Sequence, residues 1–178
     1  MKKYIRFLFV FLSMTLLTTA CGDRGPVGPE GPQGPPGPEI MPIAFEFNAT
    51  LHPSNDFEFY QSIPNQIKVL EQDVFLAFIL EDYIPEDDLE VWRKLPVTEF
   101  NSKGTLLIDY DFTLIDIRIF IDANYSLNIT DSLEDVLIRA VHIPANFTSK
   151  MVSGPSFKDA ETFEELEAMI GRNIDVIK

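Results

Sequence analysis

Hydrophobic and polar residues alternate with a period of two along much of the chain after residue 40. The alternation is clearest in residues 43–51, where five apolar side chains occupy every second position, and it recurs in 57–60, 106–113 and 115–122. Neighbouring residues of a strand point to opposite faces of a sheet, so this pattern predicts half-buried β-strands.

Three further segments predict strands with a different pattern. Residues 74–80 are apolar at every position, which is expected of a strand that has neighbours on both sides and is buried on both faces. Residues 89–95 and 136–143 are apolar-rich stretches that also contain polar residues, and each is ended by a proline, Pro96 and Pro144 respectively. Both are predicted strands.

Turn signals separate these strands. The tetrapeptide Asn-Ser-Lys-Gly at 101–104 predicts a hairpin connection. Residues 105–122 are too long for one strand, so we expect a turn or a bulge near 112–114.

One short helix is predicted near the end of the chain. Thr162 and Glu165 have the spacing of a capping box, and Gly171 suits the position just after a helix. Between them lies an apolar stripe of Phe163, Leu166, Met169 and Ile170. Ile174 and Val176 predict a final strand. About seven strands without βαβ alternation predict a mainly β fold: an antiparallel β-sandwich over residues 40–178 with one short C-terminal helix.

Residues 1–20 have the pattern of an export signal. Lys2, Lys3 and Arg6 precede an apolar stretch at 7–17, and small residues follow it. The segment resembles a bacterial lipoprotein signal, in which cleavage falls just before a cysteine that is then acylated, with palmitate as a typical acyl chain. The resemblance implies lipidation of Cys21, the only cysteine of the chain. Thr18 stands where such signals often have leucine, and an ordinary signal peptide that ends in Ala-Cys is the alternative.

Residues 21–39 form a collagen-like stem in sequence. Glycine recurs at every third position, and proline follows it in five of six triplets; the glycines are Gly22, Gly25, Gly28, Gly31, Gly34 and Gly37. Only glycine fits at the axis of a collagen triple helix, so a short homotrimeric stem is one interpretation. A stiff monomeric spacer in polyproline II conformation is the other. Either form spans roughly 55 Å, at about 3.1 Å per residue.

The order of anchor, stem and β-rich acidic head resembles small collagen-like lipoproteins of Gram-negative bacteria. Residues 21–39 carry this resemblance, and the stretches 90–96 and 111–122 of the head match more loosely. The resemblance implies a lipid-anchored protein of the cell envelope, most simply of the outer membrane, on its periplasmic or its surface face. It implies no activity for the head.

Charge and residue types narrow the classes of function. The chain has 14 basic and 28 acidic residues; residues 1–39 hold four and three of them, which leaves 10 and 25 in the head and a net charge of −15. Such a charge excludes nucleic acid as a partner. The two histidines, His52 and His142, are too few for a zinc site, and no nucleophile motif accompanies them. We therefore expect no cofactor, no metal and no enzyme activity.

Aromatic residues provide the candidate binding site of the head. Trp92 shares a strand face with Glu90 and Lys94, and a tryptophan on a polar face can stack on a sugar. Tyr60 and Tyr83 are candidates to join it. The alternative is that Trp92 closes one end of the core.

The sequence thus predicts a non-enzymatic head with a structural or interaction role, whose partner is a glycan or an envelope protein. A carbohydrate-binding surface module is the second hypothesis. A hydrolase that uses two of the many carboxylates is the third.

Overall fold

The computed structural model describes residues 41–148 and 157–177 of the 178-residue chain. The predicted signal peptide, the lipidation site Cys21 and the glycine-rich stem lie outside these residues. They stay predictions from the sequence.

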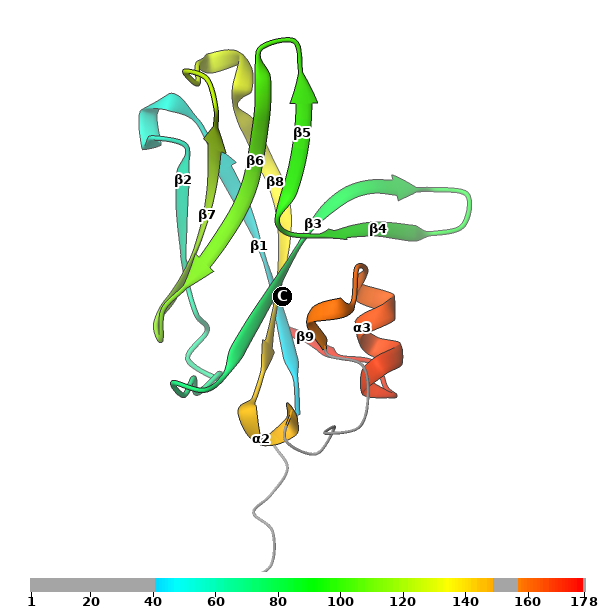
Figure 1. The fold of residues 1–178 in the computed structure, drawn as a ribbon. Helices are drawn as coiled ribbons and strands as arrows, with labels where there is room; N and C mark the ends of the chain where they lie inside the picture. Colours follow the sequence, from blue (N-terminus) through cyan, green and yellow to red (C-terminus); the bar gives the residue numbers. More distant parts are fainter. Residues whose placement is uncertain (1–40, 149–156, 178) are drawn as a thin grey trace, which may run out of the picture. The chain divides into compact units, whose positions relative to one another are not determined.

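The described residues form nine strands in two sheets (Figure 1). Sheet A has the order β4-β3-β8-β1-β9 and contains β1 (Ile43–Leu51), β3 (Val74–Ile84), β4 (Leu89–Lys94), β8 (Leu133–Ile143) and β9 (Asp175–Ile177). Sheet B has the order β2-β7-β6-β5 and contains β2 (Glu58–Ser62), β5 (Val97–Asn101), β6 (Gly104–Phe112) and β7 (Asp116–Ala123). The mainly β fold predicted from the sequence is confirmed.

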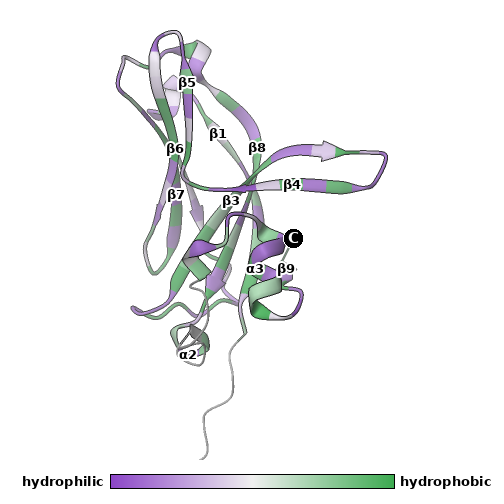
Figure 2. Cartoon of the chain, turned by 45° about the vertical axis from the view of Figure 1, so that its right-hand side comes forward, coloured by the Kyte–Doolittle hydropathy of each residue, from purple (hydrophilic) through white to green (hydrophobic). Residues whose placement is uncertain are grey.

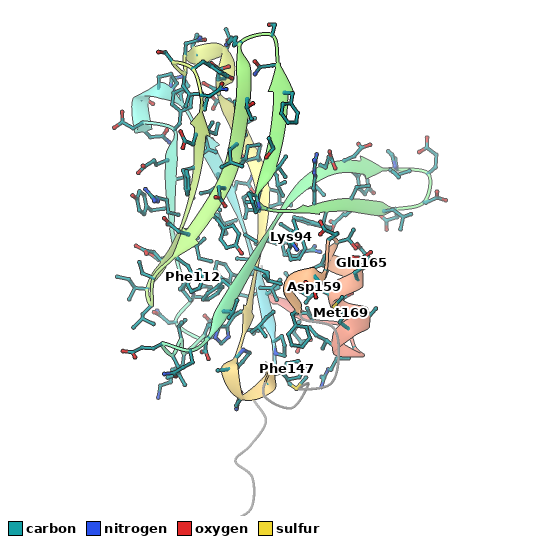
Figure 3. All side chains as sticks on the ribbon, viewed as in Figure 1. Lys94, Phe112, Phe147, Asp159, Glu165 and Met169 are labelled. Carbon is teal, nitrogen blue, oxygen red and sulfur yellow. The ribbon has the colours of Figure 1, made fainter. Side chains whose placement is uncertain are left out.

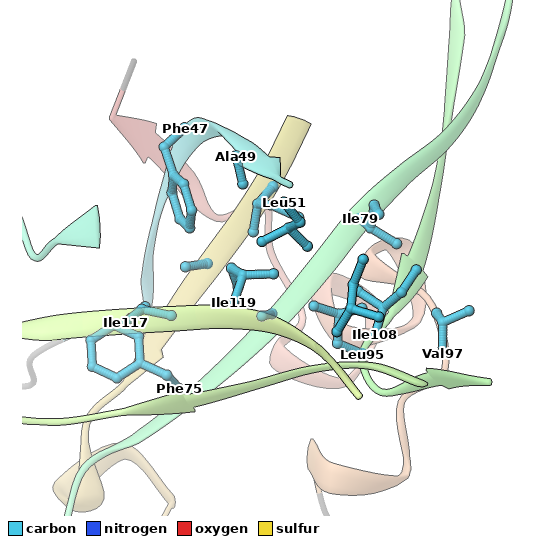
Figure 4. Close-up of a cluster of buried hydrophobic side chains, with 14 of the residues drawn as sticks. Phe47, Ala49, Leu51, Phe75, Ile79, Leu95, Val97, Ile108, Ile117 and Ile119 are labelled. Carbon is cyan, nitrogen blue, oxygen red and sulfur yellow. The ribbon is translucent and has the colours of Figure 1, made fainter. Parts of the chain in front are cut away.

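The two sheets share a continuous apolar core. Side chains from the inner face of sheet A, such as Phe47, Ala49 and Phe75, contact the inner face of sheet B, where Ile117 and Ile119 are fully buried (Figure 4). The alternation in residues 43–51 and 115–122 therefore marks core-facing positions, and the arrangement is a β-sandwich.

A helical layer covers the other face of sheet A. It consists of α2 (Ala145–Thr148), the 3₁₀ turn η4 (Phe157–Asp159) and the predicted helix α3 (Phe163–Ile170). These elements and sheet A bury a second apolar cluster, whose fully or nearly buried members include Phe78, Trp92, Val141, Phe163 and Leu166. Sheet A is consequently buried on both faces, whereas the outer face of sheet B meets solvent.

Most predicted elements form where the pattern placed them. The stretch 74–80 is an internal strand of sheet A, and the turn expected near 112–114 separates β6 from β7. The last strand, β9, pairs with β1 in the parallel direction, so sheet A is not wholly antiparallel. The sequence predicted this strand but not the direction of its pairing.

The ends of α3 follow the predicted chemistry with one difference. The Thr162 hydroxyl accepts a hydrogen bond from the N–H of Glu165 at 3.2 Å, as an N-cap does. The Glu165 carboxylate, however, accepts from the N–H of Glu161 and not from that of Thr162. Gly171 ends the helix with a φ of +80°, a conformation that favours glycine.

Strands β3 and β4 continue beyond sheet A as a projecting hairpin, which we call the arm (residues 80–94; Figure 1). β3 pairs with β8 only as far as Ile79, and from Leu80 onwards its only strand partner is β4. Figure 2 shows hydrophilic stretches along both strands of the arm. The change from apolar residues to Glu81 and Asp82 marks the place where β3 leaves the sheet.

Two isoleucines of neighbouring segments test the position of the core. Ile119 in β7 is fully buried, and Ile115 in the preceding turn is 73% exposed. We expect Ile119→Ala to lower the free energy of unfolding by about 2–5 kcal/mol, because it removes buried methylenes and leaves a cavity. The same change at Ile115 should alter it by less than about 0.5 kcal/mol. Urea unfolding measures both, and equal losses would contradict the sandwich register.

Candidate functional site

The structure places the predicted centre of the binding site, Trp92, in the second core. Its side chain is 2% exposed, and the indole N–H donates a 2.9 Å hydrogen bond to the Glu90 carboxylate. The guanidinium of Arg139 lies 3.9 Å from the centre of the ring. With its face covered, the ring is not available to stack on a sugar. The prediction of a ligand-binding Trp92 is wrong, and the alternative, a core position, is correct.

Tyr60 and Tyr83 are exposed but do not gather around Trp92. Tyr60 lies on β2 of sheet B, is 57% exposed and donates a hydrogen bond to Glu58, which raises the pKa of its phenol. Tyr83 lies on the arm, is 48% exposed and donates to Asp88, which raises the pKa of Tyr83 in the same way. The three aromatic residues belong to separate surroundings, so the predicted aromatic site is not assembled.

A buried cluster centred on Arg139 takes the place of that site. The guanidinium of Arg139 donates hydrogen bonds to Glu46 at 2.8 and 2.5 Å and to Glu90 at 2.9 Å. It also lies between two rings, 3.9 Å from the centre of Trp92 and 4.4 Å from that of Phe163. The five residues come from β1, β4, β8 and α3. Sequence reasoning missed the cluster, because its members are far apart along the chain.

The Arg139 cluster has the chemistry of a packing element. A guanidinium stays protonated at all physiological pH values, so it transfers no proton. Both carboxylates are hydrogen-bonded to it, and the flat faces of the guanidinium are covered by rings. The Arg139–Glu46 pair is nearly buried, with side chains 9% and 12% exposed, whereas the Glu90 side chain is 43% exposed. The cluster thus joins four elements of the fold through one nearly buried ion pair, one partly exposed ion pair and the two ring contacts.

A second buried polar pair, His142 with Asp73, lines a hollow of about 200 Å³ at one end of sheet A. The His142 Nε2 lies 2.9 Å from a carboxylate oxygen of Asp73, and both side chains are almost fully buried. The carboxylate also accepts hydrogen bonds from the N–H groups of Leu70 and Ala145, each at 2.9 Å. Burial opposes the ionisation of Asp73, but these three donors outweigh it and hold its pKa below the ordinary value.

The pair resembles the base and orienting carboxylate of a hydrolase, but its surroundings differ. The residues that line the hollow include no serine, threonine or cysteine; they are Lys68, Leu70, Asp73, His142, Pro144, Ala145 and Asn146. The carboxylate instead ties the segment before β3 to the start of α2. His142 is therefore a buried strand residue whose side chain is hydrogen-bonded to Asp73, and His52 caps the 3₁₀ turn η1 (Pro53–Asn55).

Carboxylates of the outer face of sheet B are engaged with Arg118. This guanidinium donates to Asp111 through two nitrogen atoms and to Glu58 at 3.0 Å, and its pKa is raised chiefly by the bond to Asp111. Asp109 and Asp111 border a hollow of about 450 Å³. Since Asp111 is already bound to an arginine, the two do not form a free acid–base pair.

In the described part of the chain, no three His, Cys, Asp or Glu side chains are grouped as a metal site would require.

A further hollow lies between the arm and the edge of sheet B. It has a volume of about 180 Å³, and we call it the arm groove; its lining residues are Ile79, Leu80, Glu81, Arg93, Val97, Glu99, Ile108 and Leu133. The floor is apolar, and the charged residues belong to the arm and to β5. Glu81 and Arg93 form an ion pair of 3.1 Å across the arm. This hollow combines an apolar floor with strand edges.

Comparisons with known proteins give no relative. No protein-family model, no curated protein and no solved structure matches the chain significantly. Among residues 41–148 and 157–177, no helix has both the length and the apolar character needed to cross a membrane. The function of the head therefore has to be inferred from its own residues.

The Arg139 cluster predicts an unequal response to the same substitution at two arginines. We expect Arg139→Met to lower the free energy of unfolding by about 3–5 kcal/mol, because Glu46 is left buried without its partner. Arg118→Met also breaks two ion pairs, but they are exposed to solvent, so the loss should be much smaller. The fluorescence of Trp92, the only tryptophan, follows urea unfolding. A larger loss for Arg118→Met would contradict this assignment.

The lowered pKa of Asp73 predicts a loss of stability in acid. Its ordinary value is 3.8 and the folded value is lower, so its contribution is complete above pH 3.8 and is lost as the pH falls through the folded value. To isolate the carboxylate, Asp73→Asn is compared with the parent in a His142→Gln background. We expect the Asn variant to be less stable at pH 7 and the difference to shrink below pH 3.8. A difference that stays constant from pH 7 to pH 3 would refute it.

Proposed function

We propose that this chain is a lipid-anchored protein of the bacterial cell envelope that displays its β-sandwich head for binding and not for catalysis. The observation that carries the proposal is the order of parts in the sequence. An export signal runs directly into Cys21, six Gly-x-y triplets follow it, and an acidic domain comes last. Each part matches what a displayed, membrane-held binding domain needs.

The anchor and the stem support the proposal physically. A single acyl chain gives only marginal membrane binding, whereas two or more hold a protein stably, and the lipidation implied at Cys21 supplies several. Triplets rich in proline stay extended, so residues 22–39 place the head up to roughly 55 Å along the chain from its anchor. A stem of that length allows the head to contact a partner beyond the lipid surface.

The properties of the head agree with a binding role. Its net charge of −15 keeps it away from anionic lipid and makes it soluble at the membrane surface. Its two apolar cores lie on either side of sheet A, which favours a stiff domain. The His142–Asp73 pair has no hydroxyl or thiol nucleophile among the lining residues of its hollow, which gives catalysis little support.

The oligomeric state follows from which form the stem takes. As a triple helix it would present three heads side by side, and binding would gain from multivalency. As a spacer it would present one. The proposal holds in both cases, because the anchor and the head do not depend on the form of the stem.

The test is fractionation of the producing bacterium with the full chain and its Cys21→Ala variant. We expect the unchanged chain in the outer-membrane fraction, with a mass increased by acyl groups, and the variant without acyl groups and released from that fraction. Thr18→Leu, which restores the more usual signal residue, is the matched control and should stay acylated.

Sedimentation of the detergent-extracted chain then gives one copy for a spacer and three for a triple helix. An unchanged chain without acyl groups, or a Cys21→Ala variant that stays in the outer-membrane fraction, would overturn the proposed anchor.

A further inference from the structure

We propose that the arm groove is a strand-addition site, where an extended segment of a cationic partner protein pairs with the open edge of β8. The inference rests on the proposed function, in which the head acts by binding, and it names the place and the kind of partner. It is carried by three independent features of the head: an unpaired strand edge, an apolar hollow beside it, and uncompensated negative charge around it.

The open edge is created by the departure of β3. β8 pairs with β1 along most of its length, from Leu133 to His142, but β3 pairs with β8 only from Ile138 to Ile143. Residues 133–137 of β8 therefore have a strand neighbour on one side only, although β8 is the central strand of sheet A. Figure 1 shows β3 turning away into the arm while β8 continues beside sheet B. A bulge interrupts this edge: Ala49 pairs with Val136 but Leu51 with Leu133, and Asp135 between them has a φ of +55° and an N–H that donates to the Thr50 hydroxyl at 3.1 Å. The backbone groups of β8 that remain unpaired on this side offer a template for a further strand.

The hollow lies where side chains of an added strand would point. Ile79, Val97 and Ile108 gather at one end of the core, as Figure 4 shows, and Leu133 of β8 also lines the hollow. Val136 and Leu137, which follow on the open edge, are only half-buried. Side chains of a strand alternate between its faces, so every second residue of an added strand would enter this apolar space. A volume of about 180 Å³ accommodates one or two aliphatic side chains.

The negative charge around the arm groove favours a positively charged partner. By its register Glu99 shares a face with Val97 and so points toward the groove, and it has no counter-ion among the residues described. Glu81 lies on the opposite wall, where Arg93 already pairs with it. The head as a whole carries −15, which disfavours a second copy of the same chain. A segment that alternates basic and apolar residues fits both the walls and the floor.

A charge that points inward from an edge strand has another known use, since it discourages edge-to-edge association. These two interpretations of Glu99 predict different effects on the binding of a basic peptide. If Glu99 only protects the edge, a basic peptide gains nothing from it. If Glu99 belongs to a binding site, its removal weakens a basic peptide specifically.

The experiment measures amide hydrogen exchange of the full chain in detergent with an acetylated hexapeptide of alternating lysine and valine. We expect slower exchange in residues 133–137, and no effect of the peptide in which glutamate replaces lysine. Glu99→Lys should raise the Kd of the basic peptide about tenfold. Glu71→Lys makes the same charge change at an exposed residue outside the groove and should alter the Kd by less than about twofold.

Several results would overturn the inference. The basic and the acidic peptide could slow amide exchange equally, or the slowed exchange could be confined to segments other than 133–137. Glu99→Lys and Glu71→Lys could change the Kd of the basic peptide equally. Exchange in 133–137 could also slow with rising protein concentration in the absence of peptide, which would indicate binding of a second copy. A failure here together with acylation and membrane retention in the fractionation experiment removes the strand-addition site alone. The reverse pattern removes the anchor and leaves the groove.

Discussion

The burial of one positive charge, that of Arg139, organises the head. Arg139 lies on the central strand of sheet A, where a guanidinium without partners would be strongly destabilising. Its partners are Glu46 on β1, Glu90 on β4, and the rings of Trp92 and Phe163. Because Arg139 contacts all of these partners at once, it holds α3 next to the β4 strand of the arm. Lys94 adds to this junction, because its ammonium group donates to the Ala160 carbonyl at 2.5 Å just before α3 (Figure 3).

The two faces of the head differ because only one sheet is covered twice. Sheet A needs apolar residues on both faces, which accounts for the unbroken stretch from Val74 to Leu80. The outer face of sheet B meets water and carries acidic residues such as Asp109 and Asp122, with Arg118 among them. The excess of negative charge is thus tolerated where solvent screens it, while the buried carboxylates Asp73 and Glu46 each have a specific partner.

Periodicity identified the elements, but not what covers them. The alternation of β1 and β7 and the uniform apolar character of β3 were sufficient to predict strands and the mainly β fold. The sequence correctly placed Trp92 on the same strand face as Glu90 and Lys94, and these charged neighbours made that face look polar. Those two residues are in fact held by Arg139 and Ala160, 49 and 66 positions away. A local pattern holds no information on contacts of that range, so a core tryptophan looked like a surface one. The sequence did not predict the open edge of β8 for the same reason, because that edge depends on where β3 leaves the sheet.

The pairing of β1 bears on how the head withstands tension. Any pull transmitted through the chain that precedes Ile43 enters the domain along β1. That strand is flanked on one side by β8 over nearly its whole length and on the other by β9, which runs parallel to its first residues. Sliding β1 out of the sheet would require its hydrogen bonds to break together and not one after another. β1, which follows the proposed stem in sequence, is therefore held by hydrogen bonds on both sides, and a load on the preceding residues would be shared between β8 and β9 before β1 separated.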